Sequence, residues 1–150
     1  MSAEDWNRPM VAEKGKILLE IVAPSRQVVR SEHVDEVIAP GSEGEFGVLP
    51  GHTPMLSMLK VGMLSYREGT QWHHVAVDWG YAEVGPDRVI ILAKGADRAA
   101  DIDLAEARIE KDRLEKLMAE KLSEQDYQKA RVDLLRTSIR IQVAEKHGQQ

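Results

Sequence analysis

Three side chains of one short segment carry groups that could exchange protons with a substrate. Glu43, Glu45 and His52 are separated by only a few residues, and a carboxylate beside a histidine is a common general acid–base pair. The same side chains also suit exposure to water or polar contacts with a partner protein. No nucleophile motif, metal cluster or signal of an apolar pocket accompanies them in the sequence. Contact with a partner is therefore the role that we favour, and a small hydrolase is an alternative.

The backbone around these residues is rich in glycine and proline. Residues 41–54 hold four glycines and two prolines around the apolar run 46–49. Glycine permits positive φ angles, whereas proline fixes φ and lacks an N–H donor. The segment therefore predicts a tight turn, a very short strand and a second rigid turn. A stiff and exposed loop of this kind suits docking better than core packing.

Residue spacing disfavours two other kinds of chemistry. Gly41, Gly44 and Gly47 recur every three residues, but no Gly-Lys-Ser/Thr follows, so the chain lacks a phosphate loop for ATP cleavage. His73 and His74 are neighbours in a predicted strand, where consecutive side chains point to opposite faces. No metal site is therefore expected.

The composition excludes several classes of protein. A net charge of −5 disfavours nucleic acid as a partner, because nucleic acids require a basic surface. The chain has no cysteine, and none of its apolar runs approaches the roughly 20 residues that span a bilayer. Its first residues lack the apolar middle of a signal peptide. We expect a cytoplasmic protein that is soluble, or attached to a membrane only through a partner.

Periodicity divides the chain into a β part and a helical part. Apolar residues alternate within 16–94, with turn signals about every ten residues, which predicts a β-sandwich or flattened barrel. The small, mixed residues 95–100 show no strand pattern and are interpreted as a hinge. Residues 101–147 change to a helical period, whereas the polar residues 1–15 predict a mobile extension. The expected fold class is α+β.

The helical part is predicted to be an antiparallel two-helix hairpin. Asp101 or Asp103 supplies an N-cap for the first helix, and Ser123 begins a new cap before the second. The second helix carries a spare apolar stripe, beyond the one that holds its mate, formed by Val132, Leu135, Ile139 and Val143. Because the spare stripe must contact the β-domain or another protein, we interpret it as the switch surface of a movable element.

Several motifs along residues 17–146 agree in order and spacing with one family. They are Gly44-Glu45-Phe46-Gly47, Pro50-Gly51-His52, Gly80-Tyr81-Ala82-Glu83-Val84 and Ile102-Asp103. Together they resemble the epsilon subunit of bacterial F-type ATP synthases. The resemblance implies a non-catalytic rotor subunit whose β-domain joins the gamma subunit to the membrane-embedded c-ring. It also implies that the hairpin inhibits ATP hydrolysis by inserting beside gamma into the ring of alpha and beta subunits.

The resemblance further implies where the chain works. The complex would hold it peripherally at the cytoplasmic face of the bacterial plasma membrane, driven by protons or sodium ions. Glu45 and His52 match the family residues that lie beside the polar loops of the c-ring, and Glu43 is next to them. An adaptor module with the same architecture in another assembly is the alternative function.

Some relatives bind ATP between the two helices, and the matching residues are Asp103, Arg136 and Arg140. Glu106 stands where that family motif has an arginine, which places a negative charge near the expected polyphosphate. Because phosphate recognition needs positive donors, we expect weak ATP binding or none, and no other cofactor.

Overall fold

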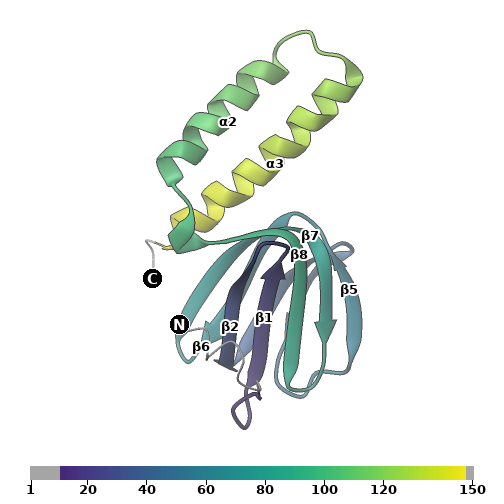
Figure 1. Cartoon of the computed structure of the whole chain (residues 1–150), viewed down its shortest axis with the longest axis vertical. Helices are drawn as coiled ribbons and strands as arrows, with labels where there is room; N and C mark the ends of the chain where they lie inside the picture. Colours follow the sequence, from purple (N-terminus) through teal and green to yellow (C-terminus); the bar gives the residue numbers. More distant parts are fainter. Residues whose placement is uncertain (1–10, 148–150) are drawn as a thin grey trace.

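A computed structural model describes residues 11–147 and has two parts (Figure 1). Eight strands form a β-domain, and two helices form a hairpin that stands on one end of it (Figure 1). The α+β fold predicted from the sequence is therefore confirmed.

The strands of the β-domain belong to one sheet that folds back on itself. Their bounds are β1 (Ile17–Ala23), β2 (Arg26–Val34), β3 (Glu36–Gly41), β4 (Gly44–Val48), β5 (Met55–Leu59), β6 (Gly62–Glu68), β7 (Gln71–Val84) and β8 (Arg88–Arg98). The order is β2-β1-β8-β7-β5-β3-β4, and β6 pairs with both β3 and β7. Because β6 joins strands from both halves of this order, the sheet forms the flattened sandwich that the turn spacing predicts.

An aliphatic core fills the space between the two layers. Leu19, Val37, Leu64, Val75 and Ile91 come from five different strands, and each is almost wholly buried. Their burial supplies the main favourable contribution to the stability of the layers. The β-domain is therefore a rigid platform for whatever its loops and outer faces contact.

One long strand, β7, bends in its middle so that it can join both layers. Its first half pairs with β6 and its second half pairs with β5. At the bend Trp79 has a φ of 47° and Gly80 a φ of 156°. A Cβ atom on Gly80 would lie 2.2 Å from the Leu92 carbonyl oxygen, so only glycine fits there. The bend also shifts the inward-facing residues from odd to even numbers, namely from Val75 and Val77 to Ala82 and Val84.

The hairpin consists of α2 (Leu104–Met118) and α3 (Glu124–His147). The Asp103 carboxylate accepts the Glu106 N–H at 3.1 Å, and Ser123 Oγ accepts the Asp126 N–H at 3.1 Å. Both predicted caps are therefore confirmed. Few side chains are buried between the helices, and most of them are small: Ala107, Leu114, Ala130 and Thr137.

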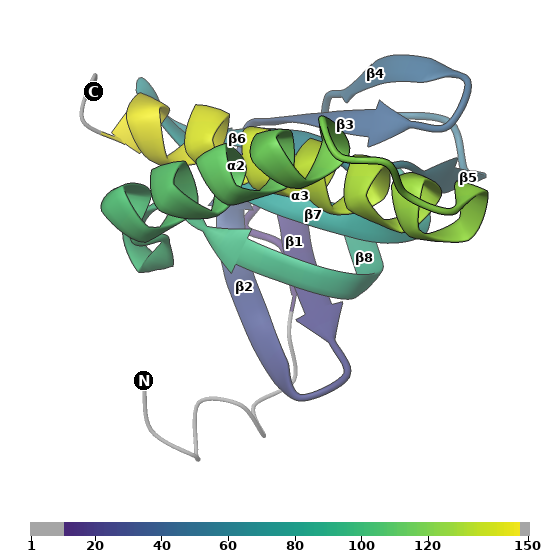
Figure 2. The same cartoon turned by 90° about the horizontal axis from the view of Figure 1, so that it is seen from above.

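The helix α3 carries most of the contact between the hairpin and the β-domain. Its neighbours there are β6, β7 and the short 3-10 helix η1 (Ala99–Asp101). Seen from above, α3 crosses over β7 (Figure 2). The loop between α2 and α3 points away from the sandwich (Figure 1).

Two expectations about the ends of the β-domain need correction. Residues 95–98 are not a strandless hinge, because they complete β8 and pair with residues 75–78 of β7. The small side chains of this stretch show no apolar alternation, so the sequence did not reveal the strand. The strand forms because the first half of β7 offers backbone hydrogen-bond partners there. Of the extension expected to be mobile, residues 1–10 lie outside the described residues. Its described part is attached to β2, since Glu13 donates its backbone N–H to the Glu32 carbonyl oxygen at 3.0 Å.

Candidate functional site

The loop residues predicted to contact a partner lie on the edge of the β-domain. Glu43 and Glu45 are exposed, and β4, which carries Glu45, ends the strand order. Gly44 between them has a φ of 135°. Gly51 has a φ of 90°, and its N–H donates to the Pro86 carbonyl oxygen at 2.6 Å. The turns on both sides of β4 are therefore fixed by backbone geometry, as the glycine and proline pattern predicts.

His52 does not form an acid–base pair with either glutamate. Its Nδ1 atom lies 2.7 Å from the Thr53 carbonyl oxygen, which makes Nδ1 the hydrogen-bond donor. No hydrogen bond or ion pair joins His52 to Glu43 or Glu45 within residues 11–147. The arrangement can offer charges and a ring nitrogen to a partner, but it lacks the contact that proton transfer between these groups requires.

A row of exposed apolar side chains crosses three strands, and the sequence analysis did not identify it. Met58 on β5, Tyr81 on β7 and Leu92 on β8 are paired in register, and each is at least half exposed. Leu56 and Trp79 lie on the same strands and are also exposed. We call these five residues the outer patch. The unbroken apolar run at residues 89–93 of β8 was the available signal, because a strand that is apolar on both faces is covered on both faces.

The spare stripe of α3 is divided between contact and exposure. Val143 is fully buried, and it packs with Ala76, Ala99 and Ile102. Ile139 packs against the same cluster. Val132 is partly buried, whereas Leu135 is 49% exposed. The structure thus brings the C-terminal half of the stripe onto the β-domain and leaves Leu135 of the other half beside solvent.

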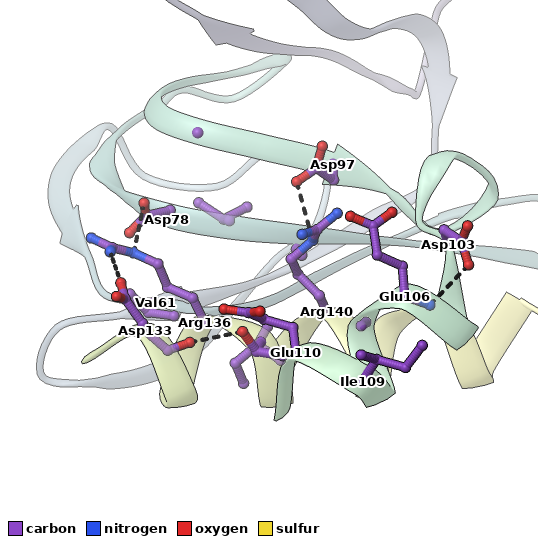
Figure 3. Close-up of a pocket in the computed structure, with 16 residues that line it drawn as sticks. Val61, Asp78, Asp97, Asp103, Glu106, Ile109, Glu110, Asp133, Arg136 and Arg140 are labelled. Carbon is purple, nitrogen blue, oxygen red and sulfur yellow. Dashed lines mark hydrogen bonds and ion pairs between the residues drawn. The ribbon is translucent and has the colours of Figure 1, made fainter. Parts of the chain in front are cut away.

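The residues expected near ATP line one cavity between the hairpin and the β-domain (Figure 3). Its volume is about 520 Å³. Arg136 Nε lies 3.0 Å from Asp78 Oδ2 on β7, and its Nη1 atom donates to Asp133 Oδ1 at 3.1 Å. The Nε contact is an ion pair without hydrogen-bond alignment, since within the described part of the chain neither Nε nor Asp78 Oδ1 has a hydrogen-bond partner. Arg140 Nε lies 3.6 Å from Asp97 Oδ2.

The lining of this acidic cavity carries more carboxylates than basic groups. Arg136 and Arg140 are its only basic lining residues among the described ones, and both face carboxylates of the protein. The acidic lining residues are Asp78, Asp97, Asp103, Glu106, Glu110 and Asp133. These carboxylates repel a polyphosphate, and both guanidinium groups already pair with carboxylates of the protein. Asp103 is also engaged as the N-cap of α2.

Among residues 11–147, no group of three or more histidine, aspartate or glutamate side chains is placed to hold a metal ion. No helix in the same range is long and apolar enough to cross a membrane.

Comparisons with known proteins agree with this architecture. The family model described as "ATP synthase, Delta/Epsilon chain, beta-sandwich domain" matches residues 16–99. ATP synthase epsilon chain 2 of Syntrophotalea carbinolica is 47% identical over 134 residues, which cover 89% of this chain and 96% of that protein. The ATP synthase epsilon chain of Syntrophobacter fumaroxidans is 50% identical over 131 residues, covering 87% and 97% respectively.

A solved structure shows the same fold at much lower sequence identity. A chain in the cryo-EM structure of the Euglena gracilis mitochondrial ATP synthase, containing OSCP, F1 and the c-ring, aligns with a TM-score of 0.74. The alignment covers 91% of this chain and 82% of that chain at 19% identity.

A β-sandwich that the delta/epsilon family model matches, followed by a helical hairpin, places the chain in the class of ATP synthase delta and epsilon chains. Within that class, the match of the β-domain and the identity along almost the whole chain are decisive. The chain belongs to the family of ATP synthase epsilon chains, which are non-catalytic subunits of the ATP synthase.

Proposed function

We propose that this chain is a rotor subunit in the central stalk of an F-type ATP synthase. In this role the β-domain couples rotation of the c-ring, through the gamma subunit, to ATP synthesis. The complex holds it as a peripheral subunit at the cytoplasmic face of the bacterial plasma membrane. The rigid aliphatic core of the sandwich supports this proposal, because torque must pass through the domain without deforming it.

The outer patch is the surface that we assign to gamma. Its central row, Met58, Tyr81 and Leu92, offers contiguous apolar area on three adjacent strands. Exposed apolar patches of this kind typically mark protein interfaces. The hairpin meets β7 at Ala76 and Asp78, before the bend, whereas Tyr81 of the outer patch lies after it.

The glycine-bounded loops are the surface that we assign to the c-ring. Glu43, Glu45 and His52 present polar groups on turns with little freedom, which suits contact with polar loops of a partner.

Charge reversal tests the c-ring assignment. Glu45→Lys lies on an exposed edge position, so folding should be unchanged while coupling between ion flow and ATP synthesis decreases. The measurement is ATP-driven ion pumping relative to ATP hydrolysis in membrane vesicles, with Glu13→Lys as the matched exposed control beside β2. Full coupling in Glu45→Lys would remove the assignment.

The hairpin is the element that we assign to inhibition of ATP hydrolysis. One observation carries this proposal: α3 docks through a small apolar cluster around Val143, and Leu135 of its spare stripe is left beside solvent. A small interface permits exchange between a docked and an extended arrangement. In the extended arrangement the spare stripe (Val132, Leu135, Ile139, Val143) contacts gamma and the alpha and beta subunits.

Truncation in the assembled complex tests the inhibitory role. A chain that ends after Asp101 keeps β8 and η1 but lacks both helices, so assembly should persist while ATP hydrolysis rises. The measurement is the hydrolysis rate of purified complex with normal subunit content. An unchanged rate in such a complex would show that the hairpin does not inhibit. ATP itself is not required to hold the docked arrangement, since Arg136 and Arg140 already pair with Asp78 and Asp97.

A further inference from the structure

A second cavity lies where the end of α3 meets the β-domain, and the proposed function leaves it unused. Its volume is about 340 Å³, near the lower limit for small-molecule sites. It is lined by Tyr66, Gln71, His73, His74, Val75, Arg98, Ala99, Ala100 and His147. Among the described residues its lining holds three histidines and an arginine but no carboxylate. We call it the histidine cavity.

Carboxylates outside the lining orient two of its cationic side chains. His73 Nε2 lies 3.0 Å from Glu68 Oε1, and the His73 ring stacks on Tyr66 with centroids 4.9 Å apart. Arg98 Nε lies 3.0 Å from Asp101 Oδ2. The Asp101 contact engages Nε, and the remaining N–H donors of the guanidinium group are on its two Nη atoms. A carboxylate thus orients one nitrogen of each side chain, Nε2 of His73 and Nε of Arg98. The other nitrogen atoms of the same side chains are then the ones that can face a ligand.

His74 is a partly buried donor of the cavity. Its Nδ1 atom lies 2.7 Å from Ser65 Oγ on β6. When Ser65 donates its proton to Nδ1, the proton of the neutral ring is on Nε2, which is then a donor. Burial lowers the pKa of His74, and the positive charges of Lys146 on α3 and His73 on β7 lower it further. Arg98 from β8 and His147 from α3 line the same space, so every charged group that lines it is a cation or becomes one on protonation.

We propose that the histidine cavity binds a phosphate group, with Arg98 as its charged anchor and His73, His74 and His147 as further donors. A guanidinium group matches phosphate oxygens through paired hydrogen bonds. An anion also relieves the mutual repulsion of the cationic groups that surround it. Inorganic phosphate and the phosphate chain of a nucleotide share this chemistry, and the small volume favours inorganic phosphate.

Occupancy of the cavity would favour the docked hairpin. His147 belongs to α3, whereas the other donors belong to the β-domain, so a bound phosphate contacts both parts. A ligand that binds only one arrangement stabilises that arrangement by mass action. This consequence rests on the proposed movement of the hairpin, whereas the site itself does not.

Histidine side-chain NMR of the full chain tests the site directly. Inorganic phosphate is added at pH 7 and constant ionic strength, up to about 20 mM, while the ring signals are followed. We expect saturable shifts of His73, His74 and His147 and a higher pKa of His74 in the presence of phosphate. His33 and His52 are internal controls, because neither lines the cavity. Equal shifts of all five histidines, or no saturation, would overturn the proposal.

Matched variants show whether Arg98 is the anchor. Arg98→Gln should weaken phosphate affinity about tenfold or more, as expected for loss of a charged hydrogen-bond partner. Arg88→Gln removes an exposed arginine from the other end of β8 and should leave the affinity unchanged. Equal affinities of the two variants would contradict the proposal.

A second variant and a second ligand complete the test. His147→Gln changes an exposed residue at the end of α3, so it preserves the fold and should weaken binding several-fold. A titration with ATP separates the two sources: shifts caused by ATP alone would identify a nucleotide phosphate chain as the ligand, and shifts caused by neither would overturn the site. Failure of these titrations would leave the coupling and hydrolysis experiments above unaffected, because they test the assembled complex.

Discussion

The acidic cavity and the histidine cavity lie against the same helix, α3, but their linings have opposite charge. In the acidic cavity Arg136 and Arg140 face carboxylates that belong to the lining itself. In the histidine cavity the carboxylates that pair with His73 and Arg98 lie outside the lining. We infer that an arginine alone does not make a phosphate site. The deciding factor is whether the carboxylate that pairs with the arginine occupies the space that a phosphate group would need.

The apolar contact of α3 lies between these two cavities along the helix. Val143 is four residues from His147, at the histidine cavity, and three from Arg140, at the acidic one. Because Val143 is fully buried among Ala76, Ala99 and Ile102, both cavities depend on its packing.

The largest effect is expected from a change that removes both cavities together. Val143→Asp places a charge in this fully buried apolar cluster, which should destabilise docking of α3 by about 3 kcal/mol or more. Leu135→Asp is the matched control on the same stripe, where the side chain is 49% exposed. Hydrogen exchange of the α3 amides measures the loss of docking. Full protection of those amides in Val143→Asp would contradict the role assigned to the cluster.

A smaller effect is expected from a change that makes the two cavities more alike. Glu106→Arg replaces a negative charge in the acidic cavity by a positive one, so ATP affinity should rise about tenfold or more. Glu115→Arg makes the same charge change on an exposed part of α2 that does not line the cavity. Calorimetric titration with ATP compares the two variants. An equal gain in both would show that overall charge, and not the lining, controls binding.

The smallest effect concerns the pH dependence of stability. Because the pKa of His74 is lowered in the folded chain, mainly by burial, the unfolded chain binds more protons below pH 6.5. The free energy of unfolding should therefore decrease as the pH falls from 6.5 through the lowered pKa. Urea denaturation at several pH values measures this decrease. His74→Gln should flatten the profile, whereas His33→Gln, at an exposed position, should not. A profile that His74→Gln leaves unchanged would assign the decrease to other groups.

Local patterns predicted most of the fold from the sequence. The alternation in β1 and β8, the glycine turns around β4, and the caps at Asp103 and Ser123 all act over a few residues. These local patterns failed at Trp79. Simple alternation groups Trp79 with the buried Val75 and Val77, but its side chain is 47% exposed. The bend at Trp79 and Gly80 changes the phase of the strand, and it is fixed by contacts with β8 that no local pattern encodes.

The charged residues show the same limit for the sites. In the sequence, Glu106 was the one residue that indicated a change in the ATP-binding motif of the family. The partners Asp78 and Asp97 come from strands distant in sequence, so their pairing with Arg136 and Arg140 required the fold. His73 and His74 contact neighbouring residues of β6, Tyr66 and Ser65 respectively, as expected for opposite faces, and the sequence did not reveal that both line one cavity with His147 of α3.

The bend in β7 gives the subunit an internal angle between two attachment points. Ala76 and Asp78 before the bend meet the hairpin, whereas Tyr81 after it belongs to the outer patch. The two contacts are therefore separated by a few covalent bonds of one strand, with no flexible connection between them. A substitution that alters the backbone at Gly80 would rotate one attachment relative to the other while leaving both surfaces chemically intact.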